Sequence, residues 1–172
     1  MSEINLEQES KDILKACQSM LRAAKHAKKD AVTKKRMKTA FYVAVEAHKT
    51  DRRKSGEPYI FHPIAVARIC AEEIGLGATS IICALLHDTV EDTEITLEDI
   101  EAQFGKEEAL IIDGLTKISD VVDNNVSLQA ENFRKILLTL SEDVRVILIK
   151  IADRLHNMRT IGSMRRDKQL KI

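Results

Sequence analysis

The apolar side chains of this chain recur at the spacing of an α-helix, and this pattern limits the fold more than any other feature. Between residues 37 and 45 they fall at i, i+3, i+4, i+7 and i+8, and His48 continues the same helical face at i+11. No segment alternates convincingly between apolar and polar residues, as a half-buried strand would. We therefore expect an all-α fold, and the uninterrupted apolar run over 78–86 is predicted to form its central core helix.

The composition agrees with a helical protein of one domain. Aromatic residues make up 3% of the 172 residues and there is no Trp, so the core must be built from Leu, Ile, Val, Ala and Met. Two prolines and six glycines leave few points at which helices must break. Lys+Arg and Asp+Glu both number 27, and this balance argues against a dedicated nucleic-acid binder.

Helix caps, glycines and apolar spacing predict where the other helices begin and end. Thr96 and Asp99 resemble a capping box, and Asn124 and Asn125 favour a loop over residues 119–126. Three further helices are predicted over residues 7–28, 63–74 and 97–104. A fourth is predicted to end near Gly114, a fifth to lie around residues 133–140, and the last to start after Ser141 and end near Gly162.

The chain is predicted to consist of an N-terminal helical region, 1–37, and one domain, 38–172. Its first 15 residues are polar and acidic, which is unlike a signal peptide, and the three cysteines show no CxxC spacing. No apolar run approaches the roughly 20 residues that span a bilayer. We expect a cytoplasmic protein with no membrane partner. Because residues 165–172 carry no helix-stop signal, we also expect a piece of a longer chain.

Two residues that can bind metals, His87 and Asp88, directly follow the apolar run. An unpartnered buried carboxylate is costly, and an acidic group near a helix C-terminus meets the unfavourable end of the helix dipole. Glu91 and Asp92 add further negative charge. A bound cation would resolve these conflicts, although a helix end that emerges into water, with His87 and Asp88 as caps, explains this segment equally well when it is taken alone.

Two other segments favour the cation. His62 stands at the start of a predicted helix, which would fix its position. Asp153 follows the apolar segment 146–152, and Asn157 and Thr160 continue a polar stripe on the same helix, where polar groups need partners. Two imidazoles and two carboxylates suit Mn²⁺, Fe or Zn²⁺, with coordination left for water. The predicted metal ligands are His62, His87, Asp88 and Asp153.

The order His…His-Asp…Asp resembles the HD-domain superfamily of metal-dependent phosphohydrolases, which are helical bundles with a metal site in the core. Longer motifs are similar to the hydrolase domain of the RelA/SpoT homologue family, and the resemblance extends over about residues 38–172. These motifs are RKSGEPYIFHP (53–63), ALLHDTVEDT (84–93), QAENFRK (129–135) and IKIADRLHNMRT (149–160).

The resemblance implies a Mn²⁺-dependent enzyme of the stringent response that converts (p)ppGpp to GDP or GTP plus pyrophosphate. It implies that one Mn²⁺ is held by the four predicted ligands. It implies that the attacking water is oriented or deprotonated by Glu91 and Asp92. It implies that the nucleotide is bound by Arg53, Lys54, Asn157 and Thr160. It also implies synthetase and regulatory domains downstream in the full-length protein.

Alternatives from other functional classes stay open. The chain is also compatible with another HD-type nucleotide phosphohydrolase, or with a non-catalytic regulatory module that binds the alarmone. The basic stretch 22–38 is interpreted as a solvated face, since no aromatic residues interleave it to stack bases. The other three histidines are interpreted as lying outside the metal-ligand set: His48 as a core or supporting residue, His156 as a residue with a structural hydrogen bond, and His26 as solvated.

Overall fold

The computed structural model describes residues 6–27, 30–123 and 143–163, and most of these residues lie in helices, as expected. Within them there is no strand, and the one extended pairing is an isolated bridge between Arg52 and Pro58. None of the helices in these ranges is both long and apolar enough to cross a bilayer. The α-helices are α1 (Leu6–Ala23), α2 (Ala31–Ala47), α3 (Phe61–Ile69), α4 (Ala78–Leu86), α5 (Thr89–Asp92), α6 (Leu97–Phe104), α7 (Lys106–Asp123) and α9 (Val144–Arg159).

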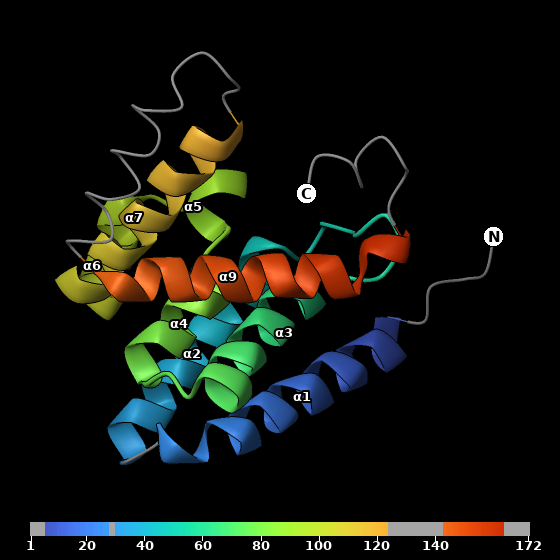
Figure 1. The fold of residues 1–172 in the computed structure, drawn as a ribbon. Helices are drawn as coiled ribbons and strands as arrows, with labels where there is room; N and C mark the ends of the chain where they lie inside the picture. Colours follow the sequence, from blue (N-terminus) through green and yellow to red (C-terminus); the bar gives the residue numbers. More distant parts are fainter. Residues whose placement is uncertain (1–5, 28–29, 124–142, 164–172) are drawn as a thin grey trace.

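Helix α4 is the centre of the bundle. It contacts α2, α3, α7 and α9, and Figure 1 shows α9 crossing over α3 and α4. Every side chain from Ser80 to Leu86 is buried, which is what a helix that is apolar on all sides requires. The prediction that the run over 78–86 forms the core is therefore confirmed.

The helix ends follow the predicted capping chemistry. The side chain of Thr96 accepts a hydrogen bond from the Asp99 amide, and the Asp99 carboxylate accepts one from the Thr96 amide, so the capping box at the start of α6 is confirmed. At the start of α9 the Asp143 carboxylate accepts from the Arg145 amide at 2.9 Å. This cap fixes the first turn of the helix that carries Asp153.

Some predicted boundaries were wrong. Helix α7 continues through the buried Gly114 to Asp123, so the predicted end near Gly114 and the predicted loop over 119–123 are both corrected. Leu115 and Ile118 are buried beyond the glycine, and burial of this face outweighs the cost of about 1 kcal/mol for a helical glycine. Residues 124–126, the predicted helix around 133–140 and the QAENFRK motif lie outside the described residues.

Helices predicted near the metal-binding segments are shifted by small amounts. Helix α3 begins at Phe61 rather than Pro63, so His62 lies in its first turn, and the following Cys70–Ile74 segment forms a π-helical turn. The first helix is α-helical to Ala23 and continues as the 3₁₀ turn Ala24–His26. A last 3₁₀ turn, Ile161–Ser163, follows α9.

Part of the basic stretch has a structural role. The guanidinium of Arg36 on α2 donates to the Phe104 carbonyl at 2.5 Å and to the Glu108 carboxylate at 2.7 Å. Glu108 is buried, and a buried carboxylate needs such a partner. The pair ties α2 to the junction of α6 and α7.

Truncating the central helix should cost far more stability than the same truncation at the surface. Leu85 is 1% exposed, so Leu85→Ala is expected to lower the free energy of unfolding by about 2–5 kcal/mol. Leu110 on α7 is 60% exposed, and Leu110→Ala should change it by less than about 0.5 kcal/mol. Urea unfolding followed by circular dichroism measures both, and equal losses would contradict the central place of α4.

Candidate metal centre

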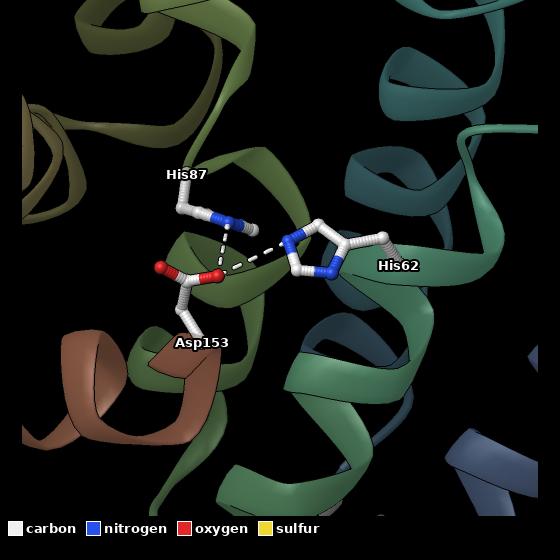
Figure 2. A group of neighbouring side chains, drawn as sticks. All are labelled: His62, His87 and Asp153. Atoms are coloured by element: carbon white, nitrogen blue, oxygen red, sulfur yellow. Dashed lines mark ion pairs between the residues drawn. The ribbon is translucent and has the colours of Figure 1, made fainter. Parts of the chain in front are cut away.

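Three elements bring the predicted metal ligands to one point. His62 lies in the first turn of α3, His87 directly follows α4, and Asp153 lies within α9. Figure 2 shows these three side chains pointing toward one another. Each is buried, and one ligand atom from each lies within 4.8 Å of the others. Segments far apart in the sequence thus form one cluster of nitrogen and oxygen atoms.

Asp88 completes the set of four. Its Oδ2 lies 3.0 Å from Nε2 of His87 and 3.6 Å from Nε2 of His62. On the other side, Oδ1 of Asp153 lies 3.2 Å from Nε2 of His62 and 4.0 Å from Nε2 of His87. The two imidazoles therefore face the two carboxylates, as the sequence predicted for a metal site.

The orientation of His87 suits a metal ligand. Its Nδ1 lies 2.9 Å from the carbonyl oxygen of Ala84, and because a carbonyl oxygen can only accept, this nitrogen carries the proton. Nε2 is then the nitrogen left for the cluster: it is buried, lies 3.0 Å from Oδ2 of Asp88, and makes no hydrogen bond within the described part of the chain. Two carboxylates beside this buried nitrogen call for positive charge, which either a proton on Nε2 or a metal ion supplies. The residues therefore fit a divalent metal ion.

The pKa values show the same preference for positive charge. Burial by itself would lower the pKa of His87, but Asp88 and Asp153 raise it to about 9. Burial would raise the pKa of both carboxyl groups, yet the facing imidazoles hold the pKa of Asp88 and of Asp153 below the usual range. The pKa of His62 is lowered, chiefly by burial. The cluster therefore favours two ionised carboxylates beside a protonated His87, and a bound metal ion would take the place of that proton.

Tyr59 supports Asp88, a role that the sequence interpretation did not assign. Its hydroxyl donates to Oδ2 of Asp88 at 2.5 Å. The Tyr59 ring packs between the imidazoles of His48 and His62, with centroid distances of 4.8 Å and 5.6 Å. Burial raises the pKa of the Tyr59 hydroxyl, which keeps it a donor. Its position three residues before His62 was the one signal in the sequence.

His48 packs against the ring of Tyr59 and does not belong to the metal-ligand cluster. It is buried, and its Nδ1 lies 2.9 Å from the Asp51 carboxylate. The interpretation of His48 as a core or supporting residue agrees with this position. His26, interpreted as solvated, is exposed and contacts the Leu76 carbonyl at 2.9 Å.

Most of the predicted nucleotide-binding residues also meet. The Arg53 guanidinium contacts Oγ1 of Thr160 at 3.3 Å and Oδ1 of Asn157 at 3.5 Å. These contacts join the loop that carries Arg53 to the C-terminal end of α9. Asn157 in turn donates to Oδ1 of Asp153 at 2.8 Å, so this polar stripe is joined to the ligand cluster. Lys54 is exposed on the same loop as Arg53.

Glu91 and Asp92 lie on α5, one turn beyond His87 and Asp88, and outside the ligand cluster. Both are exposed. Asp92 lines an open depression of about 410 Å³ together with Tyr59 and His48. Although the residue is exposed, partial burial of its carboxyl group and the charge of Asp88 raise the pKa of Asp92. Asp92 thus lies at the edge of a surface depression next to the metal-ligand cluster.

Comparison with known proteins agrees with this geometry. A sequence model described as HD domain matches residues 40–172. The chain belongs to the HD domain family. Over 139 residues this HD domain is 49% identical to the bifunctional (p)ppGpp synthase/hydrolase SpoT of Escherichia coli K12, covering 80% of the chain and 20% of that protein. Over 135 residues it is 50% identical to the GTP pyrophosphokinase rsh of Brucella melitensis, covering 77% and 18%.

These relatives confirm the resemblance to the RelA/SpoT homologue family, and this HD domain spans about a fifth of their length. A solved structure of a metazoan ortholog of SpoT has the same fold. The two superpose with a TM-score of 0.59 at 23% identity, over 78% of this chain and 77% of that one.

Removing the Tyr59 hydroxyl should weaken metal binding without unfolding the protein. Tyr59→Phe keeps the ring packing but loses the hydrogen bond to Asp88, and loss of such a supporting contact costs about 10- to 100-fold in metal affinity. Tyr42→Phe removes the same hydroxyl at a site that is 58% exposed and should change nothing. Calorimetric titration of metal-free protein with Mn²⁺ measures both affinities, and equal values would contradict the role of Tyr59.

Proposed function

We propose that this HD domain is a Mn²⁺-dependent guanosine-3′,5′-bis(diphosphate) 3′-pyrophosphohydrolase, which converts (p)ppGpp to GDP or GTP plus pyrophosphate in the stringent response. The convergence of two buried imidazoles and two carboxylates on one point carries the proposal, because this donor set suits a divalent cation. Relatives with this enzyme name support the substrate. One is from Escherichia coli O157:H7, at 49% identity over 139 residues, and another is from Vibrio cholerae, at 47% over 137 residues.

The metal is assigned to the four clustered side chains, His62, His87, Asp88 and Asp153. Two nitrogen and two carboxylate donors suit Mn²⁺ and leave coordination positions for water and phosphate. When bound, the ion supplies Lewis-acid activation, which lowers the pKa of water and neutralises charge on phosphate oxygens.

Arg53 is proposed to bind the phosphate groups of the nucleotide. A guanidinium presents a planar set of donors that matches phosphate oxygens, and it stays charged at all relevant pH values. Its contacts with Asn157 and Thr160 are long, at 3.5 Å and 3.3 Å, so an anionic ligand can replace them at little cost. Lys54, on the same loop, adds positive charge. Asn157 and Thr160 would line the nucleoside pocket.

Glu91 and Asp92 are proposed to orient the attacking water and accept its proton. A carboxylate is a better base when its pKa is raised, and burial together with Asp88 raises that of Asp92. The depression beside Asp92 provides space for the reacting groups next to the cluster. Asp92 is therefore assigned the larger share of the proton transfer.

The remaining assignments concern the full-length protein. The chain covers 20% of the length of the Escherichia coli SpoT protein and 18% of the length of the Brucella melitensis rsh protein. This small share supports the proposal that synthetase and regulatory domains accompany this one. We propose a cytoplasmic location, which the three buried free thiols support.

Turnover should require both manganese and Asp88. Metal-stripped protein incubated with ppGpp is expected to release pyrophosphate after Mn²⁺ is added and none before. Asp88→Ala should lower the rate at least about 10³-fold, since metal catalysis contributes several kcal/mol, while the helical circular dichroism spectrum is retained. Asp113→Ala removes a carboxylate that pairs with Lys117 on the surface of α7, and it should keep full activity.

Retained turnover in Asp88→Ala would remove Asp88 from the catalytic set. Binding of ppGpp without turnover in the presence of Mn²⁺ would instead favour a non-catalytic alarmone-binding module. Hydrolysis of other nucleotides in preference to ppGpp would favour a different HD-type phosphohydrolase.

The proposed base is tested separately from the metal. Asp92→Asn should lower kcat by about 10²- to 10⁴-fold, because a general base contributes in this range, with the Mn²⁺ affinity unchanged. Glu94→Gln, a neutralised exposed carboxylate two residues further on, should retain the wild-type kcat. A similar kcat in Asp92→Asn and in Glu94→Gln would contradict the role of Asp92.

A further inference from the structure

His156 contacts the proposed metal ligand His62 through two ring nitrogens of the same kind. Its Nδ1 lies 2.8 Å from Nδ1 of His62, and the two rings are tilted by 42° with centroids 5.0 Å apart. In a hydrogen bond between two imidazole nitrogens, one must carry the proton and the other the lone pair. Whichever of the two Nδ1 atoms carries the proton also decides whether Nε2 of His62 can bind a metal ion, because Nε2 is the nitrogen that faces the carboxylates.

Arg53 determines the direction of this hydrogen bond. Its guanidinium has donors and no acceptor, and Nη1 lies 3.4 Å from Nδ1 of His156. Nδ1 of His156 is therefore the acceptor, and Nδ1 of His62 must donate the proton. Nε2 of His62 is then left with its lone pair, on the side where Asp153 lies at 3.2 Å. That is the tautomer required of a metal ligand.

The next residue on α9 supports the neighbouring ligand in the same way. Asn157 donates to Oδ1 of Asp153 at 2.8 Å, while His156 accepts from His62. Arg53 contacts both of these supporting residues. Two consecutive positions of one helix thus join the proposed phosphate-binding guanidinium to two of the proposed metal ligands.

We propose that His156 is a positioning residue that holds His62 in its Nδ1-protonated form, so that Nε2 is presented to the metal ion. This inference rests on the proposed function and extends it to a residue outside the ligand set. His87 is fixed in the same tautomer by the Ala84 carbonyl, so each imidazole ligand has its own acceptor. His156 differs from that carbonyl in being a side chain, which mutation can remove.

The test compares Mn²⁺ binding by metal-free wild-type protein and two variants, by calorimetry and without substrate. His156→Leu removes the acceptor and should weaken the affinity by about 10- to 100-fold, the effect typical of lost partners of histidine ligands. His156→Asn places an amide oxygen near the position of Nδ1 and should restore most of the affinity. Rescue by asparagine separates a role in hydrogen bonding from a role in packing.

A matched control removes an imidazole elsewhere. His26→Leu makes the same change at an exposed histidine of the Ala24–His26 turn and should bind Mn²⁺ like the wild type. Circular dichroism of each metal-free variant verifies the fold. Wild-type affinity in His156→Leu, or equal losses in His156→Leu and His156→Asn, would overturn the role of His156 alone. Failure of the wild type to bind Mn²⁺ would overturn the proposed function as well.

Discussion

The buried negative charge at the end of α4 is the constraint on which the rest of this structure depends. Asp88 and Asp153 are both ionised, lie within 4 Å of the same imidazoles, and are largely shielded from solvent by the surrounding helices. Such an arrangement needs compensating positive charge, which a protonated His87 or a bound metal ion supplies. The apolar helix α4 and the helices packed on it create this cost, and the same packing holds the donor atoms in place for an ion that removes it.

Each proposed ligand is supported by one further contact, and the four contacts differ in how local they are. Two arise within a single helical segment and the other two cross between segments. The local supports are the Ala84 carbonyl for His87 and Asn157 for Asp153, three and four residues away. The distant supports are Tyr59 for Asp88 and His156 for His62, 29 and 94 residues away. A site built in this way is rigid only when the whole bundle is folded.

Sequence reasoning succeeded where a signal is local and failed where packing overrides it. The capping box of Thr96 and Asp99 and the buried run of α4 were both predictable, since each depends on neighbours within one or two turns. The end predicted near Gly114 was wrong because the glycine signal competes with the burial of Leu115 and Ile118, which only the neighbouring helices provide. The role of Tyr59 was missed because its partner, Asp88, lies on another segment, and its position near His62 does not reveal that contact.

The sequence by itself determined the helical class and the identity of the residues able to bind a metal, because helical periodicity and side-chain chemistry are properties of neighbouring residues. Only the tertiary structure decided that His62, His87 and Asp153 meet, and which nitrogen of each imidazole faces the carboxylates. The physical reason is that a hydrogen bond or an ion pair across helices depends on the separation of atoms to within tenths of an ångström. That separation is fixed by how the apolar faces pack, and no pattern within a single helix records it.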